Sequence, residues 1–146
     1  MKKQLINHTN LLFILSIFIG ISCTKTENQE TKSPSLVDQV MEVHDDAMAK
    51  MEAMHALESD IKTYLSSLDS TSAQAEIEMG AERVQALADA EEAMMNWMRN
   101  YESPSEETPE EEAKKYLTEQ KNSIGEVAQQ IDNSLEKGKA FLKGKN

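Results

Sequence analysis

Cysteine, proline, glycine and aromatic residues are all scarce in this chain. Its 146 residues include one cysteine, three prolines and five glycines, and aromatic side chains make up 5% of the total. A single cysteine cannot form an intramolecular disulfide, so no disulfide framework supports the fold. Because helix breakers are few while Ala, Glu, Gln, Met, Leu and Lys are abundant, the composition favours an all-α domain.

Basic residues are also in the minority. Fifteen Lys and Arg face 26 Asp and Glu, which gives a formal charge of -11. This balance disfavours nucleic-acid binding, because phosphate contacts need clustered Lys and Arg. The chain also has no glycine-rich phosphate loop, nucleophile elbow or His-Glu-x-x-His motif, and we therefore predict no enzymatic activity. An acid-base site at His44, Asp45 and Asp46 is disfavoured, since adjacent helical residues point in different directions.

The amino-terminal residues have the pattern of an export signal. Positive Lys2 and Lys3 precede an apolar stretch over residues 11–21. That stretch is shorter than the roughly 20 residues that span a bilayer, which favours a cleaved secretory signal over residues 1–22. Small residues precede Cys23, and this end of the signal resembles the lipobox of bacterial lipoproteins.

The resemblance to a lipobox implies that Cys23 carries the lipid. The chain would be cut before Cys23, and acyl chains such as palmitate would be attached to its sulfur and its new amino group. Several chains, at about 0.8 kcal/mol per buried methylene, make such an anchor effectively permanent. We expect a cell-envelope location, lipid-anchored at the outer membrane. The alternative is an ordinary signal cut after Ser22 that leaves a free thiol.

Residues 23–35 and 36–146 differ sharply in pattern. The segment after Cys23 is polar and contains Pro34, which predicts a flexible tether. From Leu36 onward, apolar residues recur at spacings of three and four, which predicts a helix to Leu68, with Ser35 and Asp38 as its capping box. A second helix is predicted around Ile77–Tyr101. A third is predicted to begin at Thr108-Pro109 with a capping box to Glu111 and to continue through Phe141.

Short connections favour antiparallel neighbours, so residues 36–146 are predicted to form one domain. We expect a long antiparallel helical hairpin plus a third helix, an up-down-up three-helix bundle. A hairpin that completes its core by self-association is the alternative. Glu58 and Glu91 fall on the apolar stripes, and the pattern leaves open whether the stripes fray there or the helices are rotated.

Methionine and histidine gather at one end of the predicted hairpin. A turn near residue 70 would set His44 beside Trp97, and the surrounding soft side chains form a cluster: Met41, Met48, Met94, Met95, Met98 and Tyr101. Methionine most commonly fills gaps in a core or forms an adaptable contact surface. The alternative is a copper or silver site built from Met41, His44, Met48, Met94 and Met98, since thioethers and imidazole select soft metals.

Two segments carry a family resemblance. Residues 43–51, around His44 and Met48, and residues 90–101, around Met94 and Trp97, resemble small helical lipoproteins of Bacteroidetes that are often labelled "viral A-type inclusion protein". The resemblance covers the two hairpin helices and, more loosely, the third. It implies the envelope compartment and the hairpin, and it transfers no functional residues because the family has no established activity.

The sequence thus predicts a lipid-anchored envelope protein that acts as a structural or protein-interaction module. The membrane is its first partner, through the lipid. A second envelope protein or another copy of the chain is the expected protein partner, with the Met-rich end as the contact surface. No cofactor is expected unless the alternative holds, in which case the domain buffers copper or silver in the periplasm.

Overall fold

The computed structural model describes residues 35–145, and they are helical without any strand. The predicted signal peptide, the lipidation site Cys23 and the tether up to residue 34 lie outside the described residues. The all-α prediction is confirmed for the part that is described. Four helical segments occur in chain order: α1 (Leu36–Met48), α2 (Met51–Ser66), α3 (Gln74–Asn100) and α4 (Glu110–Leu142).

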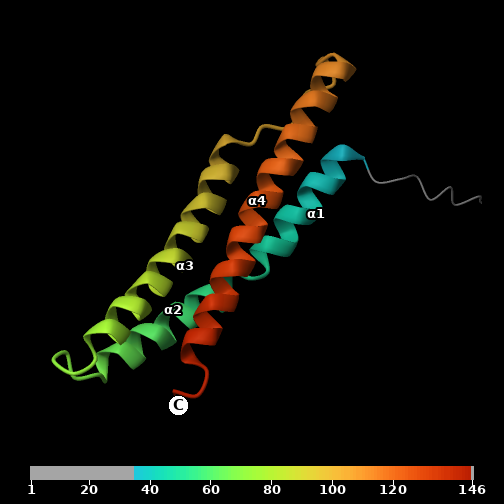
Figure 1. Cartoon of the computed structure of the whole chain (residues 1–146). Coiled ribbons are helices and arrows are strands. Elements are labelled where there is room, and N and C mark those ends of the chain that lie inside the picture. Colours follow the sequence, from blue (N-terminus) through green and yellow to red (C-terminus); the bar gives the residue numbers. More distant parts are fainter. Residues whose placement is uncertain (1–34, 146) are drawn as a thin grey trace, which may run out of the picture. The chain divides into compact units, whose positions relative to one another are not determined.

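The predicted continuous helix from Leu36 to Leu68 is wrong at one point. Ala49 and Lys50 separate α1 from α2, and the Lys50 amide donates to Ala47 O at 3.1 Å, a bond across three residues instead of four. Four-residue spacing has resumed where the Met54 amide donates to Lys50 O. Neither proline nor glycine marks the break, so the apolar pattern could not reveal it. The break accompanies a change of neighbours, since α1 packs on α4 and α2 packs on both α3 and α4 (Figure 1).

The helices lie alongside one another with two reversals of direction (Figure 1). Residues 67–73 turn the chain from α2 into α3, and residues 101–109 connect α3 to α4. Helix α4 packs against all three other segments. We call the end that holds the 67–73 connection and the carboxyl terminus the turn end. The opposite end holds the start of α1, the end of α3 and the start of α4, and we call it the aromatic end.

One hydrophobic core runs through the helical body. It draws on every helix, and its buried apolar members are Val40, Ala47, Met54, Leu57, Ile61, Leu87, Ala90, Met94, Trp97, Leu117, Ile124, Ile131, Leu135 and Phe141. Their spacings of three and four along each helix explain why these segments are helical, since one stripe of each is buried. Because every member lies within residues 40–141, this part of the chain carries its own core.

Small rotations of the helices settle the question of Glu58 and Glu91. The structure buries their neighbours Leu57 and Ala90 instead. Glu58 lies at the edge of the core and pairs with Lys62 at 2.5 Å. The same rotation buries Trp97 and leaves its neighbour Met98 38% exposed.

One predicted helix start is confirmed and one is wrong. The Ser35 hydroxyl accepts from the Asp38 amide at 3.1 Å, and the Ser35 amide donates back to the Asp38 carboxylate at 2.9 Å. By contrast, Pro109 is the N-cap of α4, and no side chain caps that end. Thr108 lies one position too early to cap, and its hydroxyl is 3.2 Å from the hydroxyl of Ser105.

Glycine has a packing role at two helix contacts. A Cβ added at Gly80 would lie 2.5 Å from Leu65 Cδ2, and one at Gly138 would lie 2.7 Å from Leu57 Cδ2. Nothing comes within 4 Å of such an atom at Gly125. The missing side chain of Gly138 is therefore what lets Leu57 of α2 approach α4 closely.

Candidate functional site

Four rings form a continuous row at the aromatic end. The ring centroids of His44 and Trp97 are 5.6 Å apart, Trp97 stacks on Tyr101 at 4.8 Å, and Tyr101 stacks on Tyr116 at 6.4 Å. We call these four residues the aromatic row. It joins α1, α3 and α4, and it confirms the prediction that residues near 44 meet those near 97.

Two polar atoms of the aromatic row have no hydrogen-bond partner. They are Trp97 Nε1 and the Tyr101 hydroxyl, both buried, and they are the buried side-chain polar atoms of residues 35–145 that lack one. A buried group left unpaired costs about 1–3 kcal/mol. The Tyr116 hydroxyl, in contrast, accepts from the Glu102 amide at 3.0 Å. The packing of the aromatic end therefore leaves two buried polar groups without the hydrogen bonds that would offset the cost of burying them.

The ring of His44 is held by its neighbour in sequence. His44 Nδ1 lies 2.9 Å from Asp45 Oδ1, and the side chain of His44 is 14% exposed against 74% for Asp45. Adjacent helical residues were expected to point apart, yet the exposed carboxylate reaches back to the imidazole. An ionised carboxylate only accepts hydrogen bonds, so Nδ1 is the donor, and in the neutral ring Nε2 keeps its lone pair.

The five candidate metal ligands from the sequence divide by burial. Met94 is fully buried, and Met41, His44 and Met48 are half-buried. Met98 is exposed to the extent given above. The structure brings His44 to Trp97 and places all five residues on α1 and α3 within two turns of that contact.

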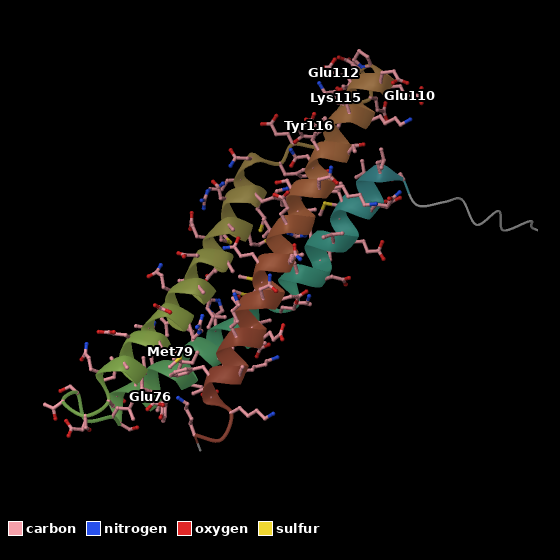
Figure 2. The ribbon with its side chains drawn as sticks, viewed as in Figure 1. Glu76, Met79, Glu110, Glu112, Lys115 and Tyr116 are labelled. Atoms are coloured by element: carbon pink, nitrogen blue, oxygen red, sulfur yellow. The ribbon has the colours of Figure 1, made fainter. Side chains whose placement is uncertain are left out.

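Methionine also accounts for the large apolar side chains that reach solvent. Within residues 35–145 these are Met95 and Met98, each 38% exposed, and Met79, 44% exposed. Met95 and Met98 are three residues apart on α3, so they share one outward strip near the aromatic end. Met79 lies near the turn end, far along the same helix (Figure 2).

The turn end has a different construction, with every polar group of its central cluster paired. Tyr64 donates to Glu76 Oε1 at 2.7 Å, and Lys145 pairs with the same carboxylate. The Lys145 ammonium also lies 4.0 Å from the ring centroid of Phe141, a cation-π contact. We call Tyr64, Glu76, Phe141 and Lys145 the carboxyl-terminal clamp.

Hydrogen bonds set the ionisation of the clamp. The bond from Lys145, followed by the one from Tyr64, lowers the pKa of Glu76 below its ordinary value of 4.5. The bond to Glu76 raises the pKa of the Tyr64 hydroxyl above its ordinary value. Both shifts keep the carboxylate charged and the phenol neutral. The sequence did not predict the clamp, because Lys145 and Glu76 are far apart in the chain and nothing local couples them.

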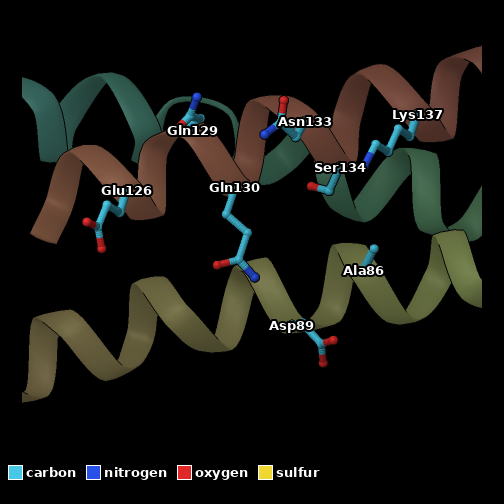
Figure 3. Close-up of a pocket in the computed structure, with 8 residues that line it drawn as sticks. All are labelled: Ala86, Asp89, Glu126, Gln129, Gln130, Asn133, Ser134 and Lys137. Atoms are coloured by element: carbon cyan, nitrogen blue, oxygen red, sulfur yellow. The ribbon is translucent and has the colours of Figure 1, made fainter.

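A polar cleft of about 400 Å³ lies between α3 and α4. Figure 3 shows Gln130 extending from α4 toward α3, with Asp89 on the facing helix. Its buried hydroxyl, Ser134 Oγ, already donates to Ile131 O at 2.9 Å, as a helical serine commonly does. Asp89 accepts from Gln85 at 2.8 Å. Amide, carboxylate and hydroxyl groups and the Lys137 side chain line the cleft.

The chain matches none of the protein-family models, curated proteins or solved structures with which it was compared. Across residues 35–145, no three His, Cys, Asp or Glu side chains gather as potential metal ligands. In the same residues no helix combines the length and the apolar character needed to cross a membrane. The aromatic end, with its unpaired polar atoms and its methionines, is the strongest candidate site.

Proposed function

We propose that this chain is a lipid-anchored, non-enzymatic interaction module of the cell envelope. Cys23 carries the lipid, residues 24–35 form the tether, and residues 36–146 form an up-down-up three-helix bundle that contacts a second envelope protein. The outer membrane is the proposed location. The contact surface is the outward strip of Met95 and Met98 on α3.

The exposed methionine pair is the observation that carries this proposal. The other large apolar side chains of the described helices, apart from Met79, are buried or half-buried. Methionine side chains are flexible and polarisable, and they are over-represented at surfaces that adapt to a partner. Two methionines one turn apart give α3 a small apolar contact surface. Glu92 and Arg99, which form an ion pair at 2.5 Å, border it.

The features that support export and lipid anchoring are in the sequence. They are the positive start, the apolar stretch of 11–21 and the single cysteine after small residues. The Cys23→Ala variant should lose its lipid and leave the membrane fraction of the producing cells. Mass spectrometry of the processed chain gives the second readout, because an acylated Cys23 adds the mass of its acyl chains. Unchanged membrane association of the variant would contradict the anchor.

The contact surface can be tested by photo-crosslinking in intact cells. A photoreactive residue is placed at position 95, with position 79 as the matched control, since Met79 is at least as exposed on the same helix. We expect one discrete crosslinked species from position 95, none from 79, and loss of the species when Met98→Glu is added. An adduct of twice the chain's mass would assign the strip to self-association. Equal adducts from both positions would contradict the proposal.

A further inference from the structure

Helix α1 packs on α4, and it reaches α3 through a side chain. Gln39 and Lys50 reach α4, where Lys121 donates to Gln39 at 2.7 Å and Lys50 pairs with Asp132 at 2.6 Å. His44 contacts Trp97 of α3. Met41 and Met48 precede and follow His44 by three and four residues, so they share its side of the helix.

Helix α3 also carries methionines near the His44–Trp97 contact. Glu91 Oε2 lies 3.7 Å from His55 Nδ1 of α2, which marks the side of α3 that faces α2. Met94 and Met98 follow Glu91 by three and seven residues and therefore lie toward the same side, with Met94 buried and Met98 at its exposed edge. Because α1 and α3 run in opposite directions (Figure 1), Met48 falls at the level of Met94 when His44 meets Trp97.

The imidazole between these thioethers is arranged as metal-binding histidines are. In such sites the second ring nitrogen usually donates to a carboxylate, which fixes the tautomer and the orientation of the ring. His44 has this arrangement, with Nδ1 at 2.9 Å from Asp45 Oδ1, and the neutral ring can offer the lone pair of Nε2 to a metal.

We propose that α1 and α3 bind one soft monovalent cation, Cu(I), beside the contact of His44 with Trp97. The ligands are His44 Nε2 and the thioethers of Met48 and Met98. Met41 of α1 and Met94 of α3 lie within one turn of this contact and supply further thioether ligands. Thioether and imidazole ligands are neutral and soft, so they select Cu(I) or Ag(I) over Mg²⁺ and Ca²⁺, which prefer oxygen. The proposal is independent of the lipid anchor. It shares Met98 with the contact strip of Met95 and Met98, and metal binding is therefore measured on the isolated fragment, without a protein partner.

The fragment from residue 24 is suited to the test because residues 40–141 hold the whole core. It is titrated anaerobically with Cu(I), and with Ag(I) as a probe that does not change oxidation state. Trp97, the single tryptophan, reports by fluorescence. We expect saturable quenching at one equivalent, and X-ray absorption of the loaded fragment should show sulfur and nitrogen ligands. Absence of quenching at micromolar metal would overturn the site.

Substitutions of equal volume separate ligation from packing. Met48→Leu and Met98→Leu remove a sulfur and keep the bulk, and each should weaken Cu(I) binding at least tenfold, whereas Met79→Leu should leave it unchanged. His44→Ala should abolish binding, and Asp45→Asn should weaken it by about tenfold, as loss of a ligand's carboxylate partner commonly does. Circular dichroism checks the fold of each variant. Equal affinity in Met48→Leu, Met98→Leu and Met79→Leu would assign the quenching to unspecific binding and overturn the proposal.

Discussion

The two ends of the helical body solve the same packing problem in opposite ways. At the turn end, the clamp pairs the Tyr64 hydroxyl and Lys145 with one carboxylate, and Gly80 lets Leu65 and Phe141 close over α3. At the aromatic end, Trp97 Nε1 and the Tyr101 hydroxyl are buried without a partner. Figure 2 places Glu76 near one end and Tyr116 near the other.

The difference separates stability from function. Paired polar groups and close glycine contacts stabilise the turn end without offering a ligand anything to bind. Unpaired buried polar groups lower stability, and they are the kind of feature that asks for an explanation other than packing. The aromatic end is therefore where a functional role is expected, and the following three tests break or sharpen the comparison.

The largest effect is expected from adding a methyl group at the glycines. Gly80→Ala should lower the free energy of unfolding by about 1–3 kcal/mol, because the new Cβ overlaps Leu65 and Phe141. Gly125→Ala is the matched control, also within a helix but with open space around it, and it should raise stability by up to about 1 kcal/mol. Urea denaturation measures both, and a stabilised Gly80→Ala would show that the turn end is loosely packed.

Removal of two tyrosine hydroxyls compares the polar groups directly. Tyr64→Phe should cost about 1 kcal/mol, because it removes a hydrogen bond to Glu76. Tyr101→Phe removes a hydroxyl without a partner and should be neutral or stabilising. Thermal and urea unfolding give the difference between the two variants. If Tyr101→Phe proves the more destabilising, the hydroxyl has a partner in solution and the contrast between the ends fails.

The smallest effect is a dependence on pH at the turn end. Since the folded state lowers the pKa of Glu76, the carboxylate contributes stability above the unfolded pKa, and this contribution is lost as the pH falls through the lowered folded value. Glu76→Gln should therefore show a shallower loss of stability than the unmodified chain as the pH falls below 4.5.

Other carboxylates titrate in the same range, so the comparison rests on the difference between the two proteins. Hydrogen bonds from Ser35 lower the pKa of Asp38, and those from Thr71 lower the pKa of Asp69. Both groups remain in Glu76→Gln and cancel. Urea denaturation at a series of pH values supplies the slopes, and identical slopes would show that the clamp contributes nothing to stability.

Sequence reasoning succeeded where a feature depends on neighbours in the chain. Helical periodicity predicted the helices, and the Ser35 capping box involves residues three apart. The meeting of His44 and Trp97 followed from the position of the turn alone. The sequence did not predict the helix break at Ala49 and Lys50 or the uncapped start of α4. It also did not predict that Ala90 and Trp97 are buried in place of Glu91 and Met98. Each of these features depends on how a helix rotates or bends against its partners.

By itself, the sequence predicted that helices make up most of residues 36–142, which side of each helix is roughly apolar, and that soft side chains collect near the contact of His44 with Trp97. Only the tertiary structure decided which methionines are buried, that two polar atoms of the aromatic row are left unpaired, and that Lys145 returns to Glu76. The reason is that periodicity fixes the stripe of a helix to within about one residue. A rotation of that size, set by packing against other helices, separates a buried side chain from an exposed one.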